Sequence, residues 1–344
     1  MKRTWFILLL CIQALGITAR SNKELYKTLD SLISCYDKLT AEKEQRINSI
    51  KQSMGNITLT PEQTYDLNIR LYDEYMAYRF DSAYYYINKN VTALRGTADH
   101  QRFAASAIRM AHILSVSGLF GRVHNLLGEI NPDSLNDEQK IAYYNQQSEL
   151  NLYRSEMAQY TDYFTEYIQQ AQYYRQLIIQ IAPQNSQDYV FNQATYISEL
   201  GDNDKAIEML ESNLLQLQEG TRDYSIVTST LAYFYHKKGD VSQQERYLLL
   251  SAISDERGAI RENNSLRSLA EILMELGDND EAYHYLFQAI SEAKFYGSRL
   301  RMMQVGRMAP QIMQLYDQKR SQTQRNTYIY LGIISLISLV LLLI

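Results

Sequence analysis

The stretch Leu276-Gly277-Asp278-Asn279-Asp280-Glu281-Ala282 is the last of three similar segments that decide the fold. The other two are Leu200-Gly201-Asp202-Asn203-Asp204-Lys205-Ala206 and Lys238-Gly239-Asp240-Val241, and successive glycines lie 38 residues apart. Each segment follows one apolar helical stretch and precedes another. A glycine can stop the first helix in the left-handed conformation, and an Asp just after it can cap the next helix. A fixed period of about 20–50 residues indicates a stacked array of helix-turn-helix repeats.

Small residues recur around these turns, where two antiparallel helices would approach closely. Ala194, Ala232 and Ala270 lie seven residues before the glycines, whereas Ala206 and Ala282 lie five residues after the first and third. The second repeat departs from this pattern, because Gln244 occupies the small position. The arrangement resembles the mid-repeat turn of tetratricopeptide repeats. The resemblance implies an all-α, superhelical array of tetratricopeptide-like repeats, but it does not identify a ligand.

The composition fits a long helical array and excludes one class of partner. The chain has 344 residues with only 4 Pro and 14 Gly, so we expect long helices with few interruptions. A formal net charge of −5 argues against a nucleic-acid-binding surface on this chain, because phosphate binding requires clustered Lys and Arg. Tyr is the unusual residue, with 29 copies. They suit helix packing in repeats, and the alternative is that some form aromatic platforms for a sugar or a peptide.

Residues 1–21 have the pattern of a secretory signal peptide. Lys2 and Arg3 precede an apolar core, and Ala19 offers a cleavage position. The core is too short to span a bilayer comfortably. A lipoprotein signal centred on Cys11 is the less favoured alternative, because a bulky leucine precedes that cysteine. Removal of this segment would leave Cys35 alone, so we expect no internal disulfide.

Residues 22–56 predict an amphipathic, coiled-coil-like N-terminal helix. Its apolar residues, from Leu25 and Leu29 to Ile47 and Ile50, recur mostly at steps of three and four. This spacing fits pairing into a homodimer and fits packing against the same chain equally well. The charged segment 38–51 is expected to be a solvated helix face.

The repeat region is predicted over residues 57–310 and is clearest at 188–290. Earlier repeats are degenerate: Tyr78 stands where a turn glycine would be, and a turn is expected near Ser155. Pro183 marks the break before the regular repeats. About six helical pairs follow from this count, which is enough for a superhelix with a concave face.

The C-terminal part of the chain divides into a polar connector, residues 311–326, and an apolar segment, residues 327–344. The apolar segment contains 17 residues without a charge from Tyr328 to Ile344, which predicts a C-terminal transmembrane helix. A buried terminal helix is the alternative. With the signal peptide, this predicts a single-pass protein of the inner (cytoplasmic) membrane with its repeats in the periplasm. Because basic residues precede the span and none follow it, we expect the natural protein to continue beyond Ile344.

The sequence contains no pattern for catalysis. The five histidines are dispersed, and no His-Glu-x-x-His motif or phosphate-binding glycine loop occurs. The acidic turns at 202–204 and 278–281 lack the glycine and distal glutamate of a calcium loop, so we interpret them as helix caps. We therefore expect no enzyme activity and no catalytic, cofactor-binding or metal site.

Binding is the remaining expectation, in the groove lined by the first helix of each pair. A mixed aromatic and basic patch there would suit an acidic peptide or a carboxylate terminus. The alternative is that its members are ordinary solvated residues. Counting back from the turn glycines gives the candidate groove residues for a protein or peptide: Thr195, Glu199, Tyr233, His236, Lys237, Arg267 and Glu271.

A second resemblance covers nearly the whole chain. The segments Leu29-Asp30-x-x-Ile33, Leu71-Tyr72-x-x-Tyr75 and Phe80-Asp81-Ser82-Ala83 resemble a family of bacterial membrane regulators known as domain of unknown function 6377. Its members combine periplasmic repeats, one transmembrane helix and a cytoplasmic output part, which would lie beyond this sequence. The resemblance implies a non-catalytic sensor or partner-binding domain in signal transduction. The alternative is a constitutive, tail-anchored scaffold for protein assembly in the envelope.

Overall fold

The computed structural model describes residues 22–53, 59–262 and 264–343, and all regular secondary structure in these ranges is helical. The predicted signal peptide, residues 1–21, lies outside the described residues. After the helical residues 22–34 come α2 (Tyr36–Gln52), α3 (Pro61–Tyr75), α4 (Phe80–Leu94), α5 (His100–Val116), α6 (Phe120–Gly128), the 3-10 turn η1 (Pro132–Ser134), α7 (Asp137–Met157), α8 (Tyr163–Ile181), α9 (Gln187–Glu199), α10 (Asn203–Leu214), α11 (Arg222–Lys238), α12 (Val241–Gly258), α13 (Ser265–Leu276), α14 (Asn279–Tyr296), α15 (Arg299–Gly306) and α16 (Ala309–Leu343).

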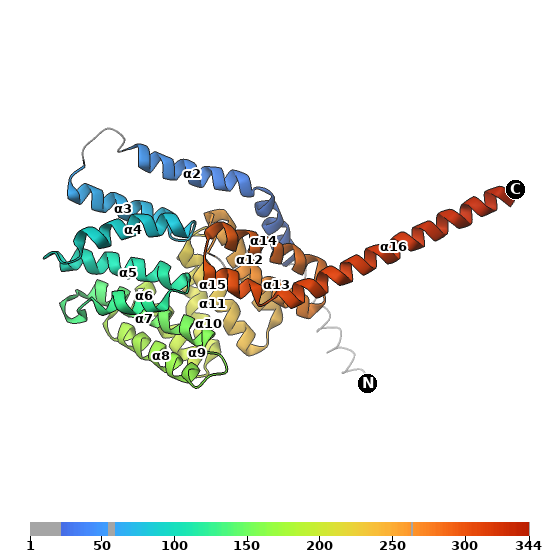
Figure 1. Cartoon of the computed structure of the whole chain (residues 1–344). Coiled ribbons are helices and arrows are strands. Elements are labelled where there is room, and N and C mark those ends of the chain that lie inside the picture. The colour runs from blue at the N-terminus through green and yellow to red at the C-terminus, as the bar shows by residue number, and fades with distance from the viewer. Residues whose placement is uncertain (1–21, 54–58, 263, 344) are drawn as a thin grey trace, which may run out of the picture.

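Consecutive helices pair and stack into one array. The pairs are α3 with α4, α5 with α6, and so on to α13 with α14, and each pair also packs against the next. Figure 1 shows these pairs winding around a common centre. The superhelical array of tetratricopeptide-like repeats that the sequence predicts is thus confirmed.

The three glycines of the repeat turns adopt the conformation that their role requires. Gly201, Gly239 and Gly277 have φ values of 99°, 75° and 82°, in the left-handed region that disfavours other residues. The small residues Ala206 and Ala282 are completely buried where the paired helices meet. Sequence therefore fixes these turns locally, through backbone conformation and close helix contact.

The predicted caps are confirmed at two of the three turns. The Asp202 carboxylate accepts a hydrogen bond from the backbone N–H of Lys205 at 3.1 Å, and Asp240 accepts one from Gln243 at 3.0 Å. Asp278 differs, because its side chain makes no capping hydrogen bond to α14. The prediction that all three acidic turns cap the next helix is therefore wrong at Asp278.

The N-terminal helical segment packs on the chain's own array. Leu29 is fully buried in the core that α9 to α14 form, and Ile47 is fully buried in the core of α3 to α7. Cys35, which is exposed, interrupts the segment between residue 34 and α2. In the described range 22–53, the apolar residues Leu29 and Ile47 pack within the chain. The N-terminal segment lies across both halves of the array (Figure 1).

The end of the array contacts its beginning. The Tyr296 hydroxyl donates to the carbonyl of Met76 at 2.9 Å, and the Ser298 hydroxyl donates to the carbonyl of Val116 at 2.7 Å. The backbone N–H of Arg261 also donates to a carbonyl in the α3–α4 turn, at 2.7 Å. The superhelix therefore closes on itself along a seam between α14–α15 and α3–α6.

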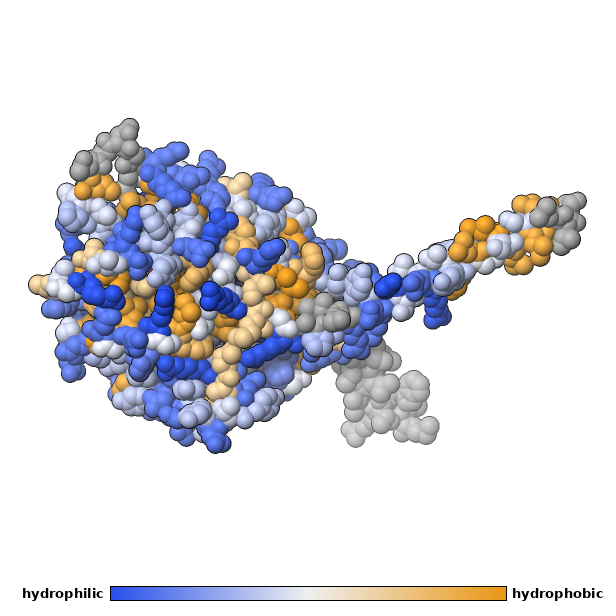
Figure 2. Space-filling model, in the orientation of Figure 1, coloured by the Kyte–Doolittle hydropathy of each residue, from blue (hydrophilic) through white to orange (hydrophobic). Residues whose placement is uncertain are grey.

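The helix α16 projects away from the array (Figure 1). It includes the predicted connector, residues 311–326, in the same continuous helix as the apolar segment that follows. Ile329 and Leu331 are 50 % and 53 % exposed, which contradicts the alternative of a buried terminal helix. Figure 2 shows apolar residues gathered towards the outer end of α16. Within the described residues, no helix has both the length and the apolar character needed to cross a membrane, so the predicted transmembrane helix at 327–344 is not supported.

Candidate functional site

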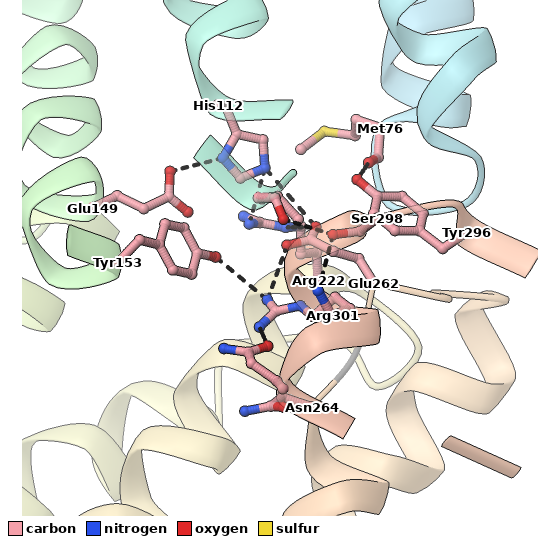
Figure 3. Close-up of polar contacts among 12 residues, drawn as sticks. Met76, His112, Glu149, Tyr153, Arg222, Glu262, Asn264, Tyr296, Ser298 and Arg301 are labelled. Atoms are coloured by element: carbon pink, nitrogen blue, oxygen red, sulfur yellow. Dashed lines mark hydrogen bonds and ion pairs between the residues drawn. The ribbon is translucent and has the colours of Figure 1, made fainter. Parts of the chain in front are cut away.

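A cluster of charged side chains lies where the array closes on itself (Figure 3). Its members come from α5, α7, α11, α15 and the α12–α13 connection, so they meet only in the folded superhelix. We call it the central polar cluster, and it consists of His112, Glu149, Tyr153, Arg222, Glu262 and Arg301.

Glu262 is the acidic centre of the cluster. Its carboxylate lies 3.4 Å from Nη2 of Arg301 and 3.9 Å from Nε of Arg222. Its side chain is only 6 % exposed. An isolated carboxylate at this depth would be costly, and pairing with two guanidinium groups offsets that cost.

His112 joins the second carboxylate to the same cluster. Its Nδ1 lies 2.8 Å from Glu149, and its Nε2 lies 3.3 Å from Nη2 of Arg222. One ring tautomer satisfies both contacts, with Nδ1 donating to Glu149 and Nε2 accepting from Arg222. Burial would raise the pKa of Glu149, but the hydrogen bond with His112, together with the nearby arginines, holds it below its ordinary value.

The cluster is built to hold helices together. Its two carboxylates face two guanidinium groups and an imidazole, so its charges are matched internally. Tyr153 adds a hydroxyl 3.3 Å from Arg301, and burial raises the pKa of this tyrosine, which keeps it a neutral phenol. We interpret the cluster as a set of polar contacts that stabilises the closed superhelix.

Among the predicted groove residues, the structure brings Tyr233 and Lys237 together. Tyr233 is 58 % exposed on α11, and the Lys237 Nζ lies 5.9 Å from the centroid of its ring. Lys237 also donates to the carbonyl and the hydroxyl of Ser198 on α9, at 2.6 and 2.9 Å. These contacts place an exposed aromatic ring and a lysine on a face shared by two neighbouring repeats. We call it the α9–α11 face.

Three predicted groove residues are engaged in ion pairs. Arg267 forms an ion pair with Glu271 one turn along α13, and its Nε donates to Asn264 at 2.7 Å. Glu199 forms an ion pair with Arg175 of α8. In the part of the chain that the structure describes, no hydrogen bond or ion pair joins Arg267 to the α9–α11 face.

The last two predicted groove residues make local contacts. The hydroxyl of Thr195 donates to the carbonyl of Phe191 in its own helix at 2.8 Å. His236 Nδ1 lies 3.3 Å from the side-chain oxygen of Gln244 on the second helix of its pair. The seven predicted residues thus occupy several local environments, and their joint role in binding stays a prediction.

The sequence prediction did not include the central polar cluster. Its members are spread from position 112 to position 301 and follow no fixed spacing. Each alone resembles an ordinary polar or charged residue of a solvated helix face. Their proximity depends on how far the superhelix turns, which local sequence patterns do not report.

The fold and these sites define the chain as a tetratricopeptide-repeat domain, a class that generally binds other proteins. Residues 33–307 match the family described as "SusR N-terminal TPR domain", and the chain belongs to this family. This match does not show the more specific resemblance to domain of unknown function 6377. No curated protein matches the chain.

One solved structure with a similar fold is described as "Crystal structure of APC/C hetero-tetramer Cut9-Hcn1". The matched chain has 14 % sequence identity, and the TM-score is 0.49. The match covers 79 % of this chain and 49 % of the solved one, so the present chain spans about half the length of that relative.

Proposed function

We propose that the array captures a protein or peptide on the α9–α11 face and acts as the partner-binding half of a membrane-associated regulator. The observation that carries this proposal is the exposed Tyr233 ring beside Lys237. Tyrosine is common among the residues that dominate binding energy, because it buries a large rigid surface and keeps a polar end.

The chemistry of the α9–α11 face favours a partner with an acidic group. A lysine ammonium has three donors, and Lys237 directs two of its contacts at Ser198. One donor therefore remains for a carboxylate of the partner. The contacts with Ser198 also hold the ammonium in place before binding, which lowers the entropy lost on association.

The proposed regulatory role rests on the resemblance to membrane regulators and on the closed shape of the array. A partner that binds across α9 and α11 changes how these two repeats stack. Because the array is closed along the α14–α15 seam, a change in stacking reaches α15 and then α16. Binding would thereby shift the population of α16 orientations, which is the form of signalling that we propose.

The proposed location is the periplasmic side of the inner membrane. Its support is the N-terminal pattern of residues 1–21, which lie outside the described residues. Protease accessibility in cells whose outer membrane has been permeabilised tests it. Cleavage of the array in those cells supports the proposal, and protection until the inner membrane is opened contradicts it.

A matched pair of variants tests the binding proposal. Tyr233→Ala removes the exposed ring of the α9–α11 face, whereas Tyr85→Ala removes a ring that is 53 % exposed on α4. In a pull-down from envelope extracts, Tyr233→Ala is expected to lose a specific partner that Tyr85→Ala retains. Equal recovery of every captured protein by the two variants would contradict the α9–α11 face as the binding site.

A reporter experiment separates the regulator from a constitutive scaffold. The full-length protein is compared with Tyr233→Ala while expression of its target genes is measured. A regulator predicts altered expression at an unchanged protein level. Loss of the partner without any change in expression across the transcriptome would favour the scaffold.

A further inference from the structure

A cavity of about 420 Å³ lies on the closure seam of the array. It forms where the starts of α4 and α15 meet the α5–α6 turn, so it exists only because the superhelix closes. Its lining residues are Phe80, Asp81, Ser117, Leu119, Arg122, Gly297 and Arg299.

Two arginines from distant parts of the chain face this cavity. Arg122 belongs to α6 and Arg299 to α15, and both line its wall. Neither guanidinium has a hydrogen bond, an ion pair or a ring contact with any residue that the structure describes. Asp81 is the acidic residue of the wall, and it forms no ion pair with either of them within the same ranges. By contrast Arg95, another exposed arginine of the array, is paired with Glu129 at 2.8 Å.

The backbone around the cavity adds positive potential to that of the arginines. The helices α4, α6 and α15 all begin at its wall. Arg79 and Leu119, which precede α4 and α6, give those helices no side-chain cap. Uncapped N–H groups and the helix dipole both favour an anion at such a position.

We propose that this cavity binds a small organic molecule through a phosphate or carboxylate group held between Arg122 and Arg299. A guanidinium donates two parallel hydrogen bonds to either kind of oxyanion. Phe80 and Leu119 supply an apolar wall for the organic part, and the volume lies in the range of small-molecule sites. This site is separate from the α9–α11 face and does not depend on the function proposed for that face.

Binding there would stabilise closure of the array. A ligand held by Arg122 and Arg299 joins α6 to α15, next to the hydrogen bond of Ser298 with Val116. Such a ligand binds the closed array better than an opened one. It therefore shifts the population towards closure and towards one position of α15.

Calorimetric titration with phenyl phosphate and with benzoate tests the proposal at constant ionic strength, with benzyl alcohol as the uncharged probe. We expect saturable binding of at least one anionic probe and none of the alcohol. The probe that binds more tightly identifies the preferred group. Arg122→Gln and Arg299→Gln should each weaken its binding by about tenfold or more, because each removes charge-assisted hydrogen bonds. Arg320→Gln, which removes an exposed arginine of α16, is the matched control and should bind as the wild type does.

Hydrogen exchange of the wild-type protein gives an answer that does not depend on variants folding. The bound anion should slow amide exchange in the first turns of α4, α6 and α15. The proposal is overturned if neither anionic probe binds at millimolar concentration, if the slowed amides lie elsewhere, or if folded Arg122→Gln and Arg299→Gln bind as tightly as Arg320→Gln.

Discussion

Tyr296, at the end of α14, donates its hydroxyl to the backbone carbonyl of Met76, which lies 220 residues earlier in the chain, at 2.9 Å. The tyrosine is 1 % exposed, and burial raises its pKa well above the ordinary value, so it stays a neutral donor. This contact, with that of Ser298, joins the two ends of the repeat array. A stack of repeats that would otherwise have two open ends thereby becomes a closed superhelix.

Tyr296→Phe tests the energetic importance of the seam. The change keeps the ring but leaves the partly buried Met76 carbonyl without its donor, so it should lower the free energy of unfolding by about 1–3 kcal/mol. Urea unfolding followed by circular dichroism measures the change. Tyr85→Phe, at an exposed ring, is the control and should have little effect. Equal stability of the two variants would show that the seam contributes nothing.

Glu262→Gln tests the central polar cluster. The change removes the carboxylate that faces Arg301 and Arg222, and leaves two guanidinium groups close together in a largely buried site. We expect a loss of about 3–5 kcal/mol in unfolding free energy. Glu62→Gln removes one partner of an exposed ion pair with Arg102 and should cost no more than about 1 kcal/mol. Chemical denaturation should therefore give clearly different unfolding free energies for the two variants. A similar small loss in both would refute the role of the cluster in stabilising the closed superhelix.

Asp255 predicts a distinctive dependence of stability on pH. Burial raises its pKa to about 8, a direction that Glu256 reinforces, although hydrogen bonds from Ser225 and Ser265 oppose it. Its pKa in the unfolded chain is about 4. Between these values the folded state holds a proton that the unfolded state has lost, so this group makes the protein less stable as pH rises from about 4 to about 8.

Asp255→Asn should remove that contribution, because the amide resembles the protonated acid and cannot ionise. The measurement is urea unfolding at pH values near 5 and near 8. Relative to wild type, the variant should gain stability on going from the lower to the higher pH. A difference between the two proteins that does not change with pH would contradict the raised pKa. Carboxylates whose pKa is lowered in the folded state, such as Glu149, make the protein less stable as pH falls. This contribution is the same in the wild type and in Asp255→Asn, so it cancels in the comparison.

Gly239→Ala tests the conformational role of the repeat turns. With φ at 75°, an alanine there adopts the left-handed region at a cost of about 1–2 kcal/mol, although no neighbouring atom would contact its Cβ. Gly121→Ala is the control, since Gly121 is helical and equally open. The control should be neutral or stabilising by up to about 1 kcal/mol. Thermal unfolding of the two variants measures the difference. Equal shifts in melting temperature would contradict the conformational role of Gly239.

The parts of the fold that depend on neighbouring residues could be predicted from sequence. Gly239 ends a helix because it adopts a positive φ, and Ala232 lets a second helix approach because its side chain is small. The repeats could therefore be predicted from the local sequence. The closed seam is different, because the contact of Tyr296 with Met76 depends on the summed rotation of all repeats between them. The central polar cluster could not be predicted for the same reason, since His112 and Arg301 come together only in the complete superhelix.

The candidate site was predicted in part for a similar reason. Position relative to the turn glycine predicted Tyr233 in the groove; the structure shows it exposed on α11, and its place in a binding groove stays a prediction. The ion pair of Arg267 with Glu271 depends on side-chain geometry within α13, and the count of positions gave no information about it. A mixed aromatic and basic patch assembled from several repeats was expected from sequence. Among the described residues, the structure instead brings Lys237 to Tyr233 and to Ser198.

The most direct test of the account is site-specific photo-crosslinking in living cells. A photoreactive amino acid replaces Tyr233 in one strain and Tyr85, on an exposed part of α4, in another. Capture on the α9–α11 face predicts a discrete crosslinked product with one partner protein at position 233 and none at position 85. The absence of any adduct at position 233, or the same adducts at both positions, would contradict capture of a partner on the α9–α11 face.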